Sequence, residues 1–156
     1  MEESIKLEGE VSEHGSLGLL MAQALELQKI DPRIYSPLVL AYIGDAVYEV
    51  LIRTRVINRG SMQVNKMHKK SASLVNAGTQ ANLIKVLMEE LTEDELAVYK
   101  RGRNAKSATT AKHAAMMDYR MATGFEALIG YLYLTGSYER MLKLVHDGLE
   151  KIGEFS

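Results

Sequence analysis

The sequence contains no cysteine among its 156 residues, which excludes a disulfide framework and metal sites built on thiolates. It also lacks any run approaching the roughly 20 apolar residues that a membrane-spanning helix needs. The first 16 residues, MEESIKLEGEVSEHGS, are acidic and polar and contain no apolar segment of the kind found in a signal peptide. These absences predict a soluble, cytoplasmic protein, and the length suits one domain with its own core.

Strands are not indicated, because no stretch alternates apolar and polar residues over a useful length, and no internal repeat is present. Apolar residues recur instead at helical spacing. We therefore predict an all-α fold of about seven helices, with residues 1–16 as a disordered acidic tail and residues 17–156 as one domain. The predicted helices cover residues 17–30, 37–58, 61–78, 79–91, 92–103, 118–136 and 137–155, and a mobile basic loop covers 101–116.

Three of the predicted helix starts have recognisable capping residues. Ser36 precedes Pro37, which suits an N-cap followed by proline at the first helical position. Thr92 with Glu95 three residues later is a capping box, and Thr79 is a plausible cap for the helix that follows it.

Two acidic residues occur in the most apolar helices. Asp45 lies in AYIGDAVYE and Glu126 in GFEALIGYLYL, and each helix also contains an interior glycine, Gly44 or Gly130. Interior glycine indicates either close packing of another backbone or room for a ligand. Two such helices packed together could present both carboxylates to one pocket and hold Mg²⁺. Alternatively, each acid is an isolated, hydrogen-bonded group of the core.

Basic residues are concentrated in the middle of the chain. Residues 1–52, 53–112 and 113–156 have net charges of −6, +7 and −2. Lysine and arginine mixed with amides and hydroxyls are suited to binding phosphates. Few aromatic residues lie between them to stack on unpaired bases, so the segment is better suited to the backbone of a duplex than to single-stranded RNA. A solvated helical surface is the alternative. The candidate RNA-binding residues are His68, Lys69, Lys70, Arg101, Arg103, Asn104 and Lys106.

Several motifs resemble those of one family. AYIGDAVYEVLIR resembles the signature helix of the ribonuclease III endonuclease domain, FEALIGYLYL resembles its second acidic motif, and HKKSASLVNAGTQA resembles the helix between them. The order and spacing of the motifs agree from about Leu38 to Tyr138. YKRGRNAKS and YRMATGFEAL make the sequence most similar to the small branch called Mini-ribonuclease III, which has the catalytic domain alone.

This resemblance implies a homodimeric all-α endoribonuclease of the bacterial cytoplasm that cuts double-stranded RNA with Mg²⁺. Asp45 and Glu126 match catalytic, metal-binding acids of the family. The implied role is maturation of large-subunit (23S) ribosomal RNA, helped by a ribosomal protein, and the GRNAKS segment would substitute for the absent RNA-binding domain.

The sequence departs from the larger family members at three acid positions. Leu38 and Ala41 stand seven and four residues before Asp45, and Thr123 stands three residues before Glu126, where those relatives have acids. Glu49, four residues after Asp45, could join the pocket or pair with a cation, and we favour the pair. The incomplete set of acids leaves a non-catalytic duplex-RNA or ribosome-binding module as the alternative function.

Overall fold

The computed structural model describes residues 16–60, 62–106 and 113–155. The chain divides into two compact units, residues 1–34 and 35–156, which are described separately. The described part of the first unit contains α2 (Leu17–Ala24) and a 3₁₀ turn, η1 (Pro32–Ile34). The Ser16 side chain caps α2 by accepting a hydrogen bond from the backbone N–H of Leu19. The predicted helix over 17–30 is therefore shorter than expected.

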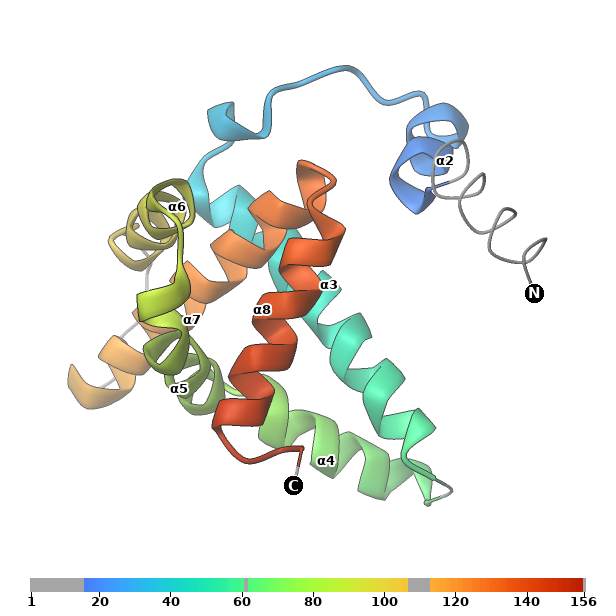
Figure 1. Cartoon of the computed structure of the whole chain (residues 1–156), viewed down its shortest axis with the longest axis vertical. Coiled ribbons are helices and arrows are strands. Elements are labelled where there is room, and N and C mark those ends of the chain that lie inside the picture. Colours follow the sequence, from blue (N-terminus) through green and yellow to red (C-terminus); the bar gives the residue numbers. More distant parts are fainter. Residues whose placement is uncertain (1–15, 61, 107–112, 156) are drawn as a thin grey trace. The chain divides into compact units, whose positions relative to one another are not determined.

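The second unit contains six α-helices and one 3₁₀ turn among its described residues (Figure 1). These elements are α3 (Pro37–Asn58), α4 (Val64–Val75), α5 (Ala77–Leu87), η2 (Met88–Glu90), α6 (Glu93–Arg103), α7 (His113–Leu134) and α8 (Tyr138–Lys151). The all-α prediction is confirmed for the part of the chain that the structure describes. In the same part, no helix is both long and apolar enough to cross a membrane.

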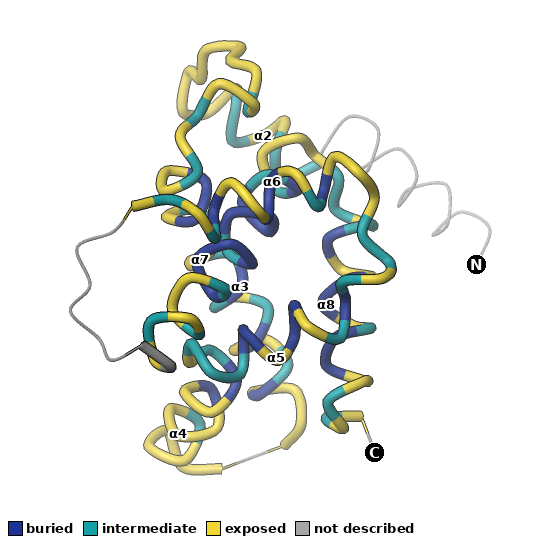
Figure 2. Tube along the Cα trace, turned by 90° about the vertical axis from the view of Figure 1, so that its left-hand side faces the viewer, coloured by how far each residue is buried: buried dark blue, intermediate teal, exposed yellow. Residues whose placement is uncertain are grey.

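The long helices α3 and α7 form the centre of the second unit. The helices α5 and α6 pack on α7, α4 packs on α3 and α5, and α8 packs on α5 and α7. Figure 2 shows buried residues along the helix faces that point into this bundle. The Tyr48 ring meets Phe125 edge-on at 5.2 Å, and its hydroxyl donates to the backbone oxygen of Leu74 at 2.7 Å, so the core also fixes the end of α4.

Two of the three predicted caps are correct. Ser36 caps α3 through the N–H of Val39, with Pro37 as the first helical residue, and Thr92 with Glu95 forms the capping box of α6. The Thr79 cap is wrong. Asn76 has extended backbone and accepts from the N–H of Thr79 at 2.8 Å, so it ends α4 and begins α5. The predicted helix over 61–78 is thus divided at Asn76.

The predicted loop over 101–116 is largely helical where the structure describes it. The helix α6 continues to Arg103 and α7 begins at His113, five residues before the predicted start, while residues 107–112 lie outside the described residues. Gly102, which lies within the predicted loop, is buried, and a Cβ there would lie 2.8 Å from the Cα of Gly124. This glycine therefore permits close packing of α6 on α7 and does not end the helix.

Candidate active site

The crossing of α3 and α7 is built on two glycines. A Cβ on Gly44 would overlap the backbone oxygen of Glu126, and a Cβ on Gly130 would overlap the backbone oxygen of Leu40. Glycine at both positions lets the two backbones touch. The sequence left open whether these glycines serve packing or a ligand, and the structure shows that they serve packing.

This close crossing brings Asp45 and Glu126 together. Their carboxyl groups share a hydrogen bond, so neither acid is an isolated group of the core. Asp45 is exposed and Glu126 is half-buried. Asp45 directly follows Gly44, so its backbone lies close to α7. Its side chain is nevertheless exposed at the edge of the contact between α3 and α7.

The pKa of Glu126 is raised from 4.5 to about 8. Burial is the largest cause, followed by the hydrogen bond to Asp45 and by its charge, whereas a hydrogen bond from Gln80 acts in the opposite direction. At neutral pH Glu126 therefore retains its proton, which it shares with Asp45 through the hydrogen bond between them. A cation bound between them would remove the repulsion that retains this proton, so the pair fits a hard divalent ion.

The other positions at which the family places acids contribute no carboxylate. Ala41 is buried, Leu38 is partly exposed, and the Thr123 hydroxyl donates to the backbone oxygen of Tyr119 at 2.9 Å. Oε1 of Glu49 forms an ion pair at 3.6 Å with the guanidinium of Arg53, one helical turn further along α3. This pairing with a cation is the role that the sequence favoured for Glu49. Within the described ranges, no group of three or more His, Asp or Glu residues gathers as a metal site. Asp45 and Glu126 are therefore a pair without a third acid in that part of the chain.

The predicted RNA-binding residues fall into two groups. His68, Lys69 and Lys70 are exposed on α4, while Arg101 and Arg103 lie in the last turn of α6, followed by Asn104 and Lys106. Figures 1 and 2 place α4 and α6 toward opposite ends of the bundle. The structure therefore does not bring the candidates into one cluster, and it leaves each group available to a ligand that runs along the bundle.

The group on α6 contains side chains that hold one another. Arg103 lies 5.7 Å from the centre of the Tyr99 ring and donates to Oδ1 of Asn104 at 3.1 Å. Arg101 donates to the backbone oxygen of Tyr35 at 3.5 Å, and Lys106 is exposed. Lys100, Arg101 and Arg103 thus lie in the last turn of α6, where the helix dipole favours positive charge.

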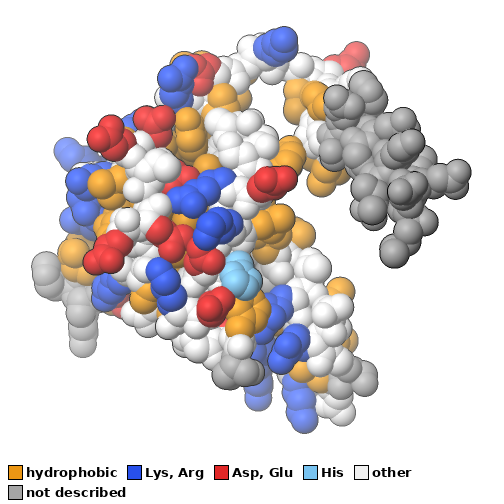
Figure 3. Space-filling model, viewed as in Figure 1, with side chains coloured by type: hydrophobic (Ala, Val, Ile, Leu, Met, Phe, Trp, Pro, Cys, Tyr) orange, Lys and Arg blue, Asp and Glu red, His pale blue; other side chains and the backbone are white. Residues whose placement is uncertain are grey.

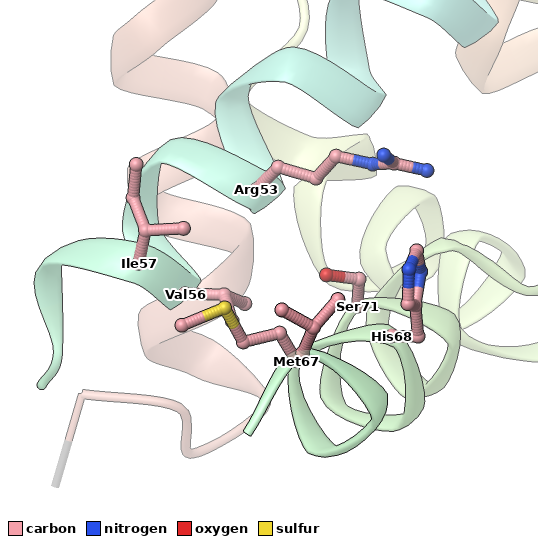
Figure 4. Close-up of a pocket in the computed structure, with 7 residues that line it drawn as sticks. Arg53, Val56, Ile57, Met67, His68 and Ser71 are labelled. Carbon is pink, nitrogen blue, oxygen red and sulfur yellow. The ribbon is translucent and has the colours of Figure 1, made fainter. Parts of the chain in front are cut away.

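The group on α4 is extended by three arginines that were not predicted as binding residues: Arg53 and Arg55 of α3, and Arg59 directly after it. Arg53 and His68 lie at one end of a hollow of about 170 Å³, opposite Val56, Ile57 and Met67 (Figure 4). A second hollow, of about 230 Å³, is lined by Arg55, Arg59 and Lys70. Lysine and arginine side chains gather over this end of the molecule (Figure 3). The helical spacing of Arg55 and Arg59 could have indicated a shared face, but the contact of α3 with α4 could not be read from the sequence.

Lys70 and Arg55 are held by the C-terminal segment. Nζ of Lys70 lies 2.7 Å from a carboxylate oxygen of Glu154, and Arg55 donates to the Glu154 backbone oxygen at 2.8 Å. The Arg55 guanidinium also lies 4.1 Å from the centre of the Phe155 ring. This segment therefore orders two cations of the α4 group.

The raised pKa of Glu126 has a measurable consequence for stability. In the unfolded chain this carboxyl ionises above about pH 4.5, whereas in the folded protein it stays protonated up to about pH 8. Because the unfolded chain releases this proton first, the free energy of unfolding falls as the pH rises from about 4.5 to about 8. Glu126→Gln cannot ionise and keeps a donor toward Asp45. We expect it to raise the free energy of unfolding by on the order of 2 kcal/mol at pH 8 in EDTA, and to have little effect near pH 4.

Thermal and urea unfolding at the two pH values measure this difference. Glu139→Gln, at an exposed position on α8, is the matched control and should leave stability unchanged at both. An equal effect of Glu126→Gln at pH 4 and pH 8 would contradict the shared proton.

A family model and several curated proteins match this chain. The ribonuclease III domain model matches residues 38–137, which run from the second residue of α3 to beyond the end of α7. A Mini-ribonuclease 3 of Clostridium tetani is 51% identical over 121 residues, covering 77% of this chain and 80% of the relative. A Mini-ribonuclease 3 of Streptococcus pneumoniae is 45% identical over 125 residues, covering 79% and 98%.

A solved structure has the same fold. The crystal structure of a protein from Fusobacterium nucleatum aligns with a TM-score of 0.69 at 32% identity, covering 76% of this chain and 96% of the other. The region matched by the family model contains both acids of the α3–α7 pair and both groups of cations on α4 and α6.

Proposed function

We propose that this chain, which belongs to the ribonuclease III domain family and is an endoribonuclease of that family, cleaves double-stranded RNA in a reaction that depends on Mg²⁺. The observation that carries the proposal is the hydrogen-bonded pair of Asp45 and Glu126 at the α3–α7 crossing. Two carboxylates that repel each other and reach solvent through Asp45 are suited to an ion that keeps several of its waters.

Asp45 and Glu126 would hold the metal, directly or through water. When bound, Mg²⁺ supplies an activated water and stabilises charge on the scissile phosphate and the leaving 3′-oxygen, which gives 5′-phosphate and 3′-hydroxyl ends. The chain's own contribution is to fix the two carboxylates on rigid helices and to release the shared proton. The cations of α4 and α6 would bind the phosphates of the duplex on either side.

A cleavage assay tests this function. A duplex RNA of defined sequence should be cut in the presence of Mg²⁺ and left intact in EDTA, and end-group analysis should find 5′-phosphates. Binding of the duplex without cleavage in Mg²⁺ would favour the non-catalytic RNA-binding module instead.

The cations should make binding strongly dependent on salt. Each phosphate contact that is lost reduces the slope of log affinity against log salt by about one. Arg101→Ala should therefore weaken duplex binding and flatten the slope by about one. Lys143→Ala removes an exposed cation of α8 that is paired with Asp147, and it should leave the slope unchanged. Equal slopes for wild type and Arg101→Ala would place the RNA contact elsewhere.

We also propose that the protein acts as a homodimer, whose two-fold axis would match the pseudo-symmetry of a duplex. An apolar stripe of α3 supports this proposal. Val39, Tyr42 and Val50 are 46%, 82% and 62% exposed, and the exposed Ala46 lies between them at helical spacing. Large apolar side chains on a central helix are typical of a protein interface.

Val50→Asp should therefore convert a dimer into a monomer, as measured by light scattering on a sizing column. Leu142→Asp, at an exposed apolar position on α8, is the matched control and should remain dimeric. A monomeric wild type would contradict the proposal.

The biological role that we propose is maturation of large-subunit ribosomal RNA, assisted by a ribosomal protein. Cleavage of a large-subunit ribosomal RNA precursor by the purified protein would test this role.

A further inference from the structure

The pair of Asp45 and Glu126 offers few oxygen ligands for a divalent ion. Across the described ranges no third acid joins it, and the Thr123 hydroxyl is engaged with the backbone of its own helix. A further side-chain oxygen near Glu126 belongs to an amide, that of Gln80.

Gln80 is a buried polar residue that interacts with Glu126 of this pair. It lies in α5, which packs on α7, and its exposure is only 2%. The side-chain nitrogen donates to the backbone oxygen of Val75 at 2.8 Å, which fixes the orientation of the amide. The same amide forms a hydrogen bond with the Glu126 carboxyl group that favours the ionised form.

The oxygen of this amide is unpaired. Oε1 of Gln80 is buried and has no hydrogen-bond partner in the part of the chain that the structure describes. Burying an unpaired carbonyl oxygen is costly, and native proteins seldom retain one without a ligand or a water to complete it. The same side chain is a hydrogen-bond partner of Glu126, so the unpaired oxygen belongs to a group next to that carboxyl.

Among the described residues, two other buried carboxylate oxygens lack hydrogen-bond partners, but each belongs to a carboxylate that forms an ion pair. Oε2 of Glu49 belongs to the ion pair with Arg53, and Oε1 of Glu90 belongs to a carboxylate that pairs with Lys151 at 3.1 Å. Neither forms a recorded contact with Glu126. Gln80 is therefore the residue whose unpaired oxygen is tied to the site.

We propose that Gln80 is a third residue of the metal site and positions its components. Its amide nitrogen orients Glu126, and its amide oxygen accepts a hydrogen bond from a water on the bound ion. This inference rests on the proposed function and deepens it, since Mg²⁺ keeps waters whose hydrogens need acceptors. The amide would supply part of what the absent acids supply in larger relatives, without adding negative charge.

Binding of Mg²⁺ alone, with no RNA present, tests the inference. Isothermal titration calorimetry should give an affinity at least about 10-fold weaker for Gln80→Leu than for wild type. Gln80→Glu places a carboxylate in the same position and should bind Mg²⁺ more tightly than wild type. Asn82→Leu removes an exposed amide from the same helix and should bind as wild type does.

Thermal unfolding with and without Mg²⁺ separates this role from a structural one. A merely structural glutamine would lower the unfolding temperature equally in both conditions, whereas our proposal requires Gln80→Leu to lose the stabilisation that Mg²⁺ provides. Wild-type affinity in Gln80→Leu would overturn the inference. If Gln80→Leu does not fold, Gln80→Glu decides, and an affinity that is unchanged or weaker would overturn it.

Asp45→Asn distinguishes this inference from the proposed function. If Asp45→Asn loses Mg²⁺ binding while Gln80→Leu retains it, only the role of Gln80 is wrong. If Asp45→Asn binds Mg²⁺ as wild type does, the metal site itself is elsewhere and the proposed function loses its support.

Discussion

Asp45→Asn should cut duplex RNA at least about 100-fold more slowly than wild type at saturating Mg²⁺. The substitution keeps the size and shape of the side chain but removes the charge that binds the ion. Because Asp45 is exposed, its carboxylate contributes little to the core, and the variant should unfold at about the wild-type temperature in EDTA. Single-turnover cleavage with excess enzyme measures the loss without interference from product release.

Glu49→Gln is the matched control for this variant. Glu49 lies one turn further along the same face of α3 and is paired with Arg53, so its loss should reduce cleavage by no more than a few-fold. Wild-type cleavage by Asp45→Asn would show that the mechanism does not use this carboxylate. An equal loss in both variants would show that charge on this face, and not the α3–α7 pair, is what matters.

Gly44→Ala should destabilise the protein by about 3 kcal/mol or more, at the upper end of the cost of overpacking a core. The added methyl group would overlap the backbone oxygen of Glu126, and a backbone oxygen within a packed helix cannot move aside as the end of a flexible side chain can. The central helices would have to separate, which would also pull Asp45 away from Glu126. Cleavage should therefore fall even under conditions in which the variant remains folded.

Gly78→Ala makes the same chemical change in a different helix. A Cβ at Gly78 would meet its nearest neighbour, Oδ1 of Asn76, at 3.4 Å, which is ordinary contact. Because alanine favours a helix by up to about 1 kcal/mol over glycine, this variant should be as stable as wild type or slightly more stable. Urea unfolding of both variants provides the comparison, and equal stabilities would contradict the close crossing of α3 and α7.

Much of the fold was predictable because helix starts depend on residues near in sequence. Ser36 with Pro37, and Thr92 with Glu95, satisfy the free N–H groups of their own first turns, so these helix starts follow from sequence alone. The prediction was wrong at Asn76, where one predicted helix divides, and at His113, where α7 begins five residues before its predicted start. Asn76 is a cap within what reads as one continuous helix, and Gly102 is explained only by its contact with Gly124.

The sequence by itself determined that the chain is helical, that Asp45 and Glu126 are acids in two glycine-bearing apolar helices, and that its cations lie in the middle of the chain. Tertiary structure decided that these two acids share a hydrogen bond, that Asp45 is exposed, and that Gln80 interacts with Glu126. The physical reason is one of range. Periodicity and capping act within a few residues along the chain. The contact between the two carboxyl groups depends instead on how closely two helices that are distant in sequence cross. Gly44 and Gly130 determine that distance, because they let the backbones of α3 and α7 touch.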